Sequence, residues 1–201
     1  MLTKEACRQK MKQARAALSD NDYAMLNAGL LTHFKQLSLA HVACMHIFLP
    51  IARQKEPNTY ALMDYIKQAY PAMKLVVPRS DLKANTMTHH VLTPHLELVQ
   101  NKWGMLEPVE TASDIDTALI DLVVLPLLGF DRRGNRVGYG MGYYDRFLHY
   151  CRHDVQKVGL SLFEPSVEPI EHEEHDIPLD QCVTPEKIWI FNNRFLSKNF
   201  V

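Results

Sequence analysis

The sequence predicts an α/β fold, a single layered domain with a largely parallel central sheet flanked by helices. Two observations lead to this prediction. Short apolar runs that indicate buried strands alternate along the chain with segments whose apolar residues recur at helical spacing. The 201 residues also contain no internal repeat, low-complexity tract or linker that would divide the chain, so we expect one domain over residues 1–201.

The first two predicted elements are helices. Thr3 can cap a helix over about residues 4–18, and the Ser19-Asp20-Asn21 cluster ends that helix and can begin a second. Apolar residues recur at intervals of three and four along both segments, as on the inward face of an amphipathic helix. In the first helix they are Cys7, Met11, Ala14 and Leu18, and in the second they are Leu26, Leu30, Leu31 and Phe34.

After these helices the apolar residues form short compact runs, which are typical of strands. The expected strands are residues 42–49, 75–77, 87–92, 119–125, 158–162 and 187–191. Thr59 opens a further helix that extends through Ala69, and another helix is expected over residues 143–151. Because helices connect several of these strands, the order favours a largely parallel sheet.

Composition argues against several classes of protein. The net charge of −1 gives no global basic field, so we expect no nucleic-acid partner. No stretch approaches the roughly 20 apolar residues of a membrane span, and residues 1–12 contain no apolar signal core. Four widely spaced cysteines without a CxxC pair favour reduced thiols, and we expect a cytoplasmic protein. The cysteines are Cys7, Cys44, Cys151 and Cys182.

The most informative segment is glycine-rich and covers residues 126–145. It follows the clearest predicted strand and ends at a predicted helix, and it holds five of the eight glycines: Gly129, Gly134, Gly138, Gly140 and Gly142. Glycines let backbone N–H groups approach an anion, so the segment suits a phosphate. It matches neither the Walker A nor the dinucleotide-binding pattern. A turn-rich hairpin without a ligand is the alternative, but the adjoining Arg136, Tyr143, Tyr144 and Asp145 favour a site.

The segment GFDRRGNRVGYGMGYYDRFL closely resembles the signature of the 5-formyltetrahydrofolate cyclo-ligase family. Smaller matches follow the family's order over nearly the whole chain. They are Lys4-x-x-x-Arg8, Phe48-Leu49-Pro50, Glu56-x-x-Thr59, Val77-Pro78-Arg79, Trp103-Gly-Met-Leu-Glu-Pro108 and His175-Asp176. The resemblance implies an enzyme that uses ATP and Mg²⁺ to convert 5-formyltetrahydrofolate to 5,10-methenyltetrahydrofolate, with release of ADP and phosphate.

The resemblance also implies roles for individual residues. Lys4, Arg136 and Tyr144 are the expected catalytic residues, with Arg136 neutralising charge on the transferring phosphoryl group. The expected nucleotide-binding residues are Lys4, Arg8, Arg136, Val137, Gly138, Tyr139, Gly140, Met141, Gly142, Tyr143 and Tyr144. The expected folate-binding residues are Leu49, Glu56, Tyr139, Gly140, Met141, Gly142 and Tyr143. Some family members carry basic residues or glycine where this chain has Tyr139 and Met141.

Several of these roles have plainer alternatives. From the helix alone, Lys4 and Arg8 could form a solvated cationic face, and Lys12 and Arg15 are expected to remain in solvent. Glu56, which could accept paired donors from a pterin ring, could instead be an exposed loop carboxylate.

Two carboxylates are the expected magnesium ligands. The resemblance assigns this role to Asp145 and Asp176, whose hard oxygen atoms suit Mg²⁺. For Asp145, a carboxylate that favours the helix N-terminus is the alternative. The His172-Glu-Glu-His175 segment lacks the spacing of a zincin, so we do not expect zinc there.

Two other classes of function stay open on the sequence. One is an enzyme of the sugar-phosphate isomerase type on a similar scaffold, which would need no ATP. The other is a non-catalytic module that binds a nucleotide or folate. The expected partners are small molecules, 5-formyltetrahydrofolate and ATP, and we expect a monomer or a weak homodimer.

Overall fold

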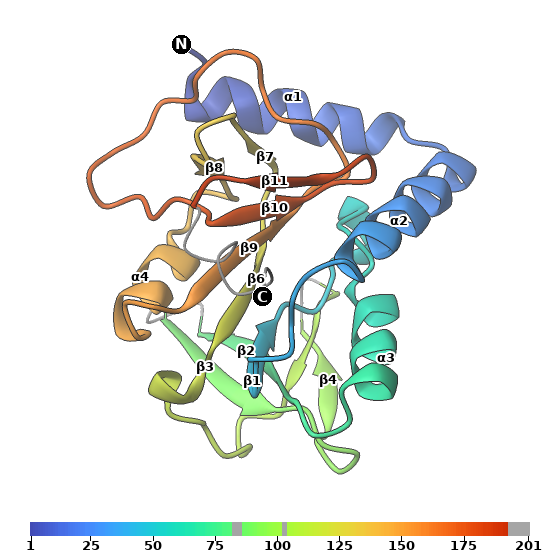
Figure 1. Cartoon of the computed structure of the whole chain (residues 1–201), viewed down its shortest axis with the longest axis vertical. Coiled ribbons are helices and arrows are strands. Elements are labelled where there is room, and N and C mark those ends of the chain that lie inside the picture. Colours follow the sequence, from blue (N-terminus) through green and yellow to red (C-terminus); the bar gives the residue numbers. More distant parts are fainter. Residues whose placement is uncertain (82–85, 102–103, 193–201) are drawn as a thin grey trace, which may run out of the picture.

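The computed structural model describes residues 1–81, 86–101 and 104–192, so Trp103 of the predicted motif lies outside the described residues. Its centre is a seven-stranded sheet in the order β11-β10-β9-β6-β1-β2-β3 (Figure 1). The strands are β1 (Cys44–Ile47), β2 (Lys74–Asp81), β3 (Thr86–Val91), β6 (Leu122–Pro126), β9 (Gln156–Leu160), β10 (Gln181–Val183) and β11 (Ile188–Ile190). The helices are α1 (Lys4–Ala17), α2 (Asp20–Phe34), α3 (Thr59–Ala69) and α4 (Tyr143–Tyr150).

The predicted largely parallel sheet is confirmed. Every neighbouring pair from β10 to β2 is parallel, and only the two edge strands, β3 and β11, pair antiparallel with their neighbours. Among the described residues, two short antiparallel ladders lie outside this sheet. They are β4 (Leu98–Gln100) with β5 (Leu106–Pro108), and β7 (Gly129–Phe130) with β8 (Arg136–Val137).

Helices cover both faces of the sheet, which explains the compact apolar runs of the central strands. On one face, α2 and α3 bury residues such as Phe34 and Ile66 against β1 and β6. On the other face, α4 buries Phe147 and Leu148 against Val123. In Figure 1, α4 lies on the opposite side of the sheet from α2 and α3. No residue from Leu122 to Leu125 is exposed, because β6 lies between these two layers.

Local signals in the sequence predicted the helices well. The Thr3 side chain accepts a hydrogen bond from the Ala6 backbone N–H at 3.2 Å, and Ser19 accepts one from Asp22 at 3.1 Å. These contacts satisfy N–H groups that the first turn of a helix leaves free. The third helix begins at Thr59 and ends at Ala69, as predicted.

The structure corrects several strand predictions. β2 continues through Pro78 to Asp81, because Pro78 lies beyond Val76, the last residue of β2 that pairs with β1. The strand expected from residue 119 begins at Leu122, since Thr117–Leu119 forms a 3₁₀ turn capped by Asp116. β10 was not predicted.

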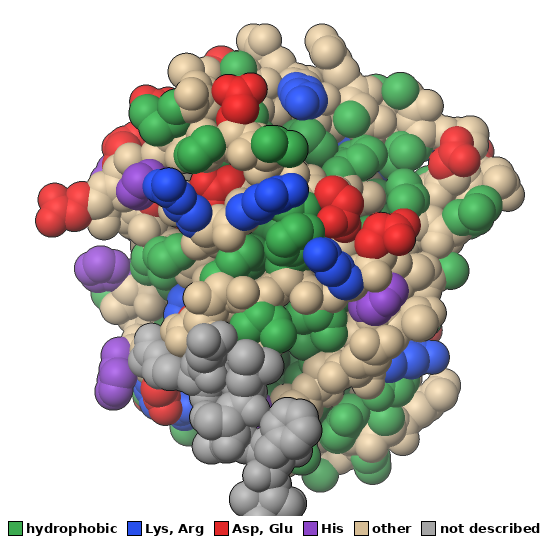
Figure 2. Space-filling model, turned by 45° about the horizontal axis from the view of Figure 1, so that its top comes forward, with side chains coloured by type: hydrophobic (Ala, Val, Ile, Leu, Met, Phe, Trp, Pro, Cys, Tyr) green, Lys and Arg blue, Asp and Glu red, His purple; other side chains and the backbone are tan. Residues whose placement is uncertain are grey.

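The cysteine and membrane predictions can also be compared with the structure. All four cysteines are free, in agreement with reduced thiols. Within residues 1–81, 86–101 and 104–192, none of the helices has the length and apolar character needed to cross a bilayer. On the face shown in Figure 2, Lys and Arg side chains are interspersed with Asp and Glu rather than gathered in one basic patch.

Helix α1 rests on the β7–β8 hairpin at Gly129, which allows a close approach. A Cβ atom at Gly129 would lie 2.8 Å from Cys7 Sγ and 3.2 Å from Met11 Cγ. We therefore expect Gly129→Ala to push α1 outward and to lower the free energy of unfolding by about 1–3 kcal/mol. Urea unfolding followed by circular dichroism measures the change. Gly138→Ala is the matched control, because a Cβ there meets nothing within 4 Å, and equal midpoints for the two variants would contradict the prediction.

Candidate active site

One large cavity, of about 1380 Å³, opens where β1 and β6 end. Ligands of α/β proteins commonly bind beyond the carboxyl ends of parallel strands. The first turns of α1, the loop after β1, the glycine-rich loop, the start of α4 and the segment 171–176 line this cavity. Every site residue expected from the sequence lines it: Lys4, Arg8, Leu49, Glu56, Arg136, Val137, Gly138, Tyr139, Gly140, Met141, Gly142, Tyr143, Tyr144, Asp145 and Asp176.

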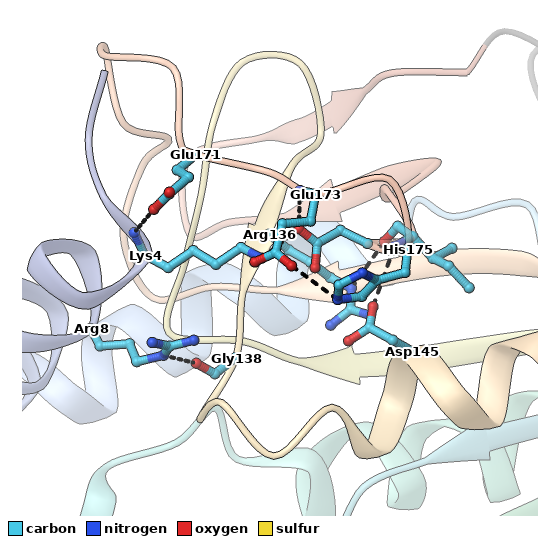
Figure 3. Close-up of polar contacts among 10 residues, drawn as sticks. Lys4, Arg8, Arg136, Gly138, Asp145, Glu171, Glu173 and His175 are labelled. Carbon is cyan, nitrogen blue, oxygen red and sulfur yellow. Dashed lines mark hydrogen bonds and ion pairs between the residues drawn. The ribbon is translucent and has the colours of Figure 1, made fainter.

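Glycines shape the loop that enters α4. Gly140 and Gly142 have φ values of +98° and +64°, in the left-handed region that favours glycine. A Cβ at Gly140 would lie 3.4 Å from the Arg8 guanidinium, whose Nε donates a hydrogen bond to Gly138 O at 3.1 Å (Figure 3). The loop therefore holds Arg8 at the cavity wall. Arg8 therefore does not belong to the solvated cationic face that was its alternative role.

Lys4 lies among the carboxylates of the segment 171–176. Its Nζ is 2.6 Å from Asp176 Oδ2 and 3.0 Å from Glu173 Oε1. Its backbone N–H donates to Glu171 Oε2 at 3.3 Å, as Figure 3 shows. Burial disfavours the charged ammonium, but the hydrogen bonds that Lys4 donates to Asp176 and Glu173 outweigh it and raise the pKa of Lys4. The alternative of a freely solvated Lys4 does not fit this environment.

Arg136 is the most buried cation of the cavity wall, with a side chain only 6% exposed. Its Nη2 donates to Asp145 Oδ1 at 2.7 Å, and its Nε donates to Ile177 O at 3.2 Å. Burial lowers the pKa of Arg136, although Asp145 and Asp176 oppose the shift. The guanidinium is thus held rigidly beside the two expected metal ligands.

Glu56 is buried, with 3% of its surface exposed, so it is not the exposed loop carboxylate that was the alternative. Its Oε1 accepts a hydrogen bond from the Tyr139 hydroxyl at 2.6 Å, and its Oε2 accepts one from the Ile51 N–H at 2.7 Å. Burial raises the pKa of Glu56, and the bonds from Tyr139 and Ile51 and the charge of Arg15 partly oppose this.

The expectation that Arg15 remains in solvent was wrong. Arg15 is 3% exposed, and its Nη1 donates to the Tyr139 hydroxyl at 3.1 Å. Lys12, by contrast, is exposed as predicted. The spacing of the arginines could have indicated this burial, since Arg15 lies seven residues after Arg8 and so falls on the same face of α1.

Possible metal ligands are few in this region. Across the described residues, no group of three or more His, Cys, Asp or Glu side chains could hold a metal ion. His172 and His175 are exposed, and His175 Nε2 lies 3.4 Å from Glu173. Asp145 and Asp176 remain the carboxylates that face the cavity beside Arg136.

Comparison with known proteins shows to which family the chain belongs. Residues 1–185 match the family model described as the 5-formyltetrahydrofolate cyclo-ligase family. The chain belongs to the 5-formyltetrahydrofolate cyclo-ligase family. The matched part contains the whole cavity wall and every strand of the central sheet except β11.

Individual members of the cyclo-ligase family are similar over different lengths. The 5-formyltetrahydrofolate cyclo-ligase of Mus musculus is 31% identical over 194 residues, which cover 90% of this chain and 92% of that protein. The enzyme of the same name from Escherichia coli K12 is 40% identical over 98 residues, 48% of this chain. The chain thus spans 54% of that relative's length.

Solved structures support the cyclo-ligase fold. The 5,10-methenyltetrahydrofolate synthetase of Aquifex aeolicus aligns over 94% of this chain and 92% of its own, with a TM-score of 0.74 and 25% identity. The synthetase of Mycoplasma pneumoniae covers 91% of this chain and 99% of its own, with a TM-score of 0.72 and 20% identity, and so supports the fold alone.

Proposed function

We propose that this chain uses ATP and Mg²⁺ to convert 5-formyltetrahydrofolate to 5,10-methenyltetrahydrofolate, releasing ADP and phosphate. One observation carries the proposal. A single cavity in a member of the cyclo-ligase family gathers the cations, carboxylates and glycine-rich backbone that this reaction needs. Such a site suits phosphoryl transfer, where catalysis consists mostly of positioning and charge stabilisation.

The chemistry starts from an unreactive formamide, because the N5 lone pair is delocalised into the formyl carbonyl. Transfer of the γ-phosphoryl group of ATP to the formyl oxygen converts that oxygen into a leaving group. N10 then attacks the formyl carbon, which closes the ring, and N10 loses its proton to solvent. Breaking of the bond between that carbon and the phosphorylated oxygen releases inorganic phosphate and leaves the conjugated 5,10-methenyl cation. No nucleophile from the protein is required. We assign to Arg136, whose side chain is 6% exposed and paired with Asp145, the role of neutralising the charge that develops on the phosphoryl group.

Lys4 and Arg8 are the proposed ligands of the ATP phosphates. Both side chains line the cavity, one helical turn apart on α1. Lys4 is already paired with Asp176 and Glu173, so its binding to a phosphate involves an exchange of partners. Asp176 thereby becomes available to another cation.

Asp145 and Asp176 would hold Mg²⁺. They fit this ion, because magnesium takes hard oxygen ligands and in nucleotide sites often uses one or two carboxylates together with phosphate oxygens and water. Both hydrogen bonds of Asp145 use Oδ1, so its Oδ2 is without a hydrogen-bond partner in the described part of the chain. The bound ion would supply positive charge next to the phosphates.

The proposed folate pocket is built around Glu56 and Leu49, with Tyr139, Tyr143 and the loop between them. Both oxygens of Glu56 are held by hydrogen bonds from the protein, and each keeps a further lone pair for a donor of the pterin ring. Tyr144 is proposed to help position the reacting groups at the start of α4.

The test is a near-ultraviolet absorbance assay of the conjugated methenyl product with purified protein, 5-formyltetrahydrofolate and MgATP. The expected result is an absorbance rise that requires both ATP and magnesium. The absence of product with MgATP, in a protein that binds no ATP, would overturn the proposal and favour an enzyme of the isomerase type. Binding of ATP and folate without any product would leave a non-catalytic binding module and overturn the proposal.

A further inference from the structure

A buried cation lies behind the folate pocket without contributing to the cavity wall. Arg15, at the C-terminal end of α1, is 3% exposed and does not line the cavity. It donates through Nη2 to the Leu127 carbonyl and through Nη1 to the Tyr139 hydroxyl. Its Nε is buried and has no hydrogen-bond partner within the described ranges.

Burying a guanidinium is costly unless a negative charge compensates it. No carboxylate of the described residues lies within ion-pair distance of Arg15, so direct pairing does not compensate this charge. Arg15 is instead linked to the carboxylate of Glu56 through the Tyr139 hydroxyl. This hydroxyl accepts a hydrogen bond from Arg15 and donates one to Glu56 at 2.6 Å. The three side chains form a directional chain of hydrogen bonds from α1 into the cavity.

We propose that Arg15 is a positioning residue for folate, which acts through the Tyr139 hydroxyl to keep the buried Glu56 ionised and fixed in orientation. This inference rests on the proposed function, in which Glu56 accepts the donors of the pterin ring. Because the hydroxyl oxygen of Tyr139 accepts from Arg15, its proton is directed toward Glu56. A protonated Glu56 would lose an acceptor site and would bind the pterin less tightly.

The pH dependence follows from the groups that face Glu56. They are Arg15 from α1, Tyr23 from α2, Tyr139 from the glycine-rich loop and Tyr144 from α4. Burial raises the pKa of all three tyrosines, so they stay neutral between pH 5 and pH 8. Burial also raises the pKa of Glu56, and Arg15 opposes that shift. Removing Arg15 therefore raises the pKa of Glu56 further, and folate affinity is lost at a higher pH.

The test compares Arg15→Met, Arg15→Lys and Tyr139→Phe with the unmodified protein. In Arg15→Met we expect the Kd for 5-formyltetrahydrofolate to rise about tenfold or more near pH 6 and to stay within about threefold near pH 8. Tyr139→Phe should behave similarly, since it breaks the same chain while Arg15 keeps its bond to Leu127. Arg15→Lys keeps the charge, and its Kd near pH 6 should lie between those of Arg15→Met and the unmodified protein. The control is Lys10→Met, which removes an exposed cation of α1 and should bind 5-formyltetrahydrofolate as the unmodified protein does.

A second measurement follows Glu56 itself. In protein labelled with ¹³C at the glutamate carboxyl carbon, the Glu56 resonance is assigned by its absence in Glu56→Gln. Its titration should move to higher pH in Arg15→Met and stay in place in Lys10→Met. The Kd measurements use 5-formyltetrahydrofolate for every variant, so the protonation of folate affects all of them equally.

The outcomes separate this inference from the proposed function. An unchanged Glu56 titration, or an affinity loss of equal size at both pH values, would show that Arg15 only anchors α1 and would overturn the inference. In either case, folate binding by the unmodified protein would leave the proposed function intact. If the unmodified protein binds no 5-formyltetrahydrofolate, the proposed function fails and the positioning role fails with it.

Discussion

Replacing Arg136 with methionine is expected to lower kcat by about 10³-fold, since an arginine that stabilises a transferring phosphoryl group contributes on this scale. The Arg136 side chain is 6% exposed and held by Asp145 and Ile177, so its charge is fixed before the substrates arrive. The KM for ATP should change much less than kcat, because the charge that Arg136 neutralises develops in the transition state. Steady-state kinetics with MgATP and 5-formyltetrahydrofolate measure both quantities.

Two further variants make this expectation specific. Arg136→Lys keeps the charge but loses the guanidinium group that reaches both Asp145 and Ile177. Its kcat should therefore lie between those of Arg136→Met and the unmodified protein. Arg133→Met removes an exposed cation from the same hairpin and should leave kcat within about twofold. A methionine variant that keeps its unfolding temperature and most of its kcat would remove Arg136 from the catalytic step.

The sequence predicted the location of the cavity well because its strongest signal was local. The glycine-rich segment had to follow a strand and precede a helix, and both β6 and α4 lie where this order requires. To place the α1 cations Lys4 and Arg8 in the site, one must also know where that helix packs. Contact of Cys7 with Val137 and Ile170 shows this by placing α1 over the β7–β8 hairpin.

Partners within the cavity could not be predicted from the sequence, because they join residues far apart in the chain. Arg15 and Lys12 are alike in type and lie on one helix, yet only Arg15 is buried. Its burial depends on Tyr139 and Leu127, more than 100 residues later. β10 was missed for a related reason: three residues are too few for any periodicity, and parallel pairing with β9 defines this strand.

The structure also shows that the expected cations and carboxylates neutralise one another. Lys4 pairs with Asp176, and Arg136 pairs with Asp145, so two of the three expected phosphate-contacting cations each contact an expected metal ligand. The third, Arg8, pairs with Glu5 instead. Binding of a nucleotide with its metal ion would then exchange partners within a nearly neutral cluster. This arrangement avoids an isolated buried charge before the ligands bind.

Replacing Asp145 with asparagine is expected to raise the Mg²⁺ concentration for half-maximal activity about tenfold or more, and to lower kcat/KM by a similar factor at limiting magnesium. Asparagine keeps an oxygen that can accept from Arg136 and Ile177, as Asp145 Oδ1 does. It removes the negative charge and replaces Oδ2, the atom proposed to face the ion. A magnesium titration at fixed ATP and folate measures the shift, and chelation by EDTA should abolish turnover in both proteins.

This substitution separates the two explanations of Asp145. If the carboxylate only orients Arg136, Asp145→Asn lowers kcat but leaves the magnesium requirement unchanged, and the ligand role is wrong. If it binds the ion, the half-saturating concentration moves while kcat at high magnesium recovers in part. Asp154→Asn is the matched control, because that carboxylate pairs with Arg152 at 3.0 Å and is 60% exposed outside the cavity. Its magnesium dependence should equal that of the unmodified protein, since neither its charge nor its partner faces the proposed ion.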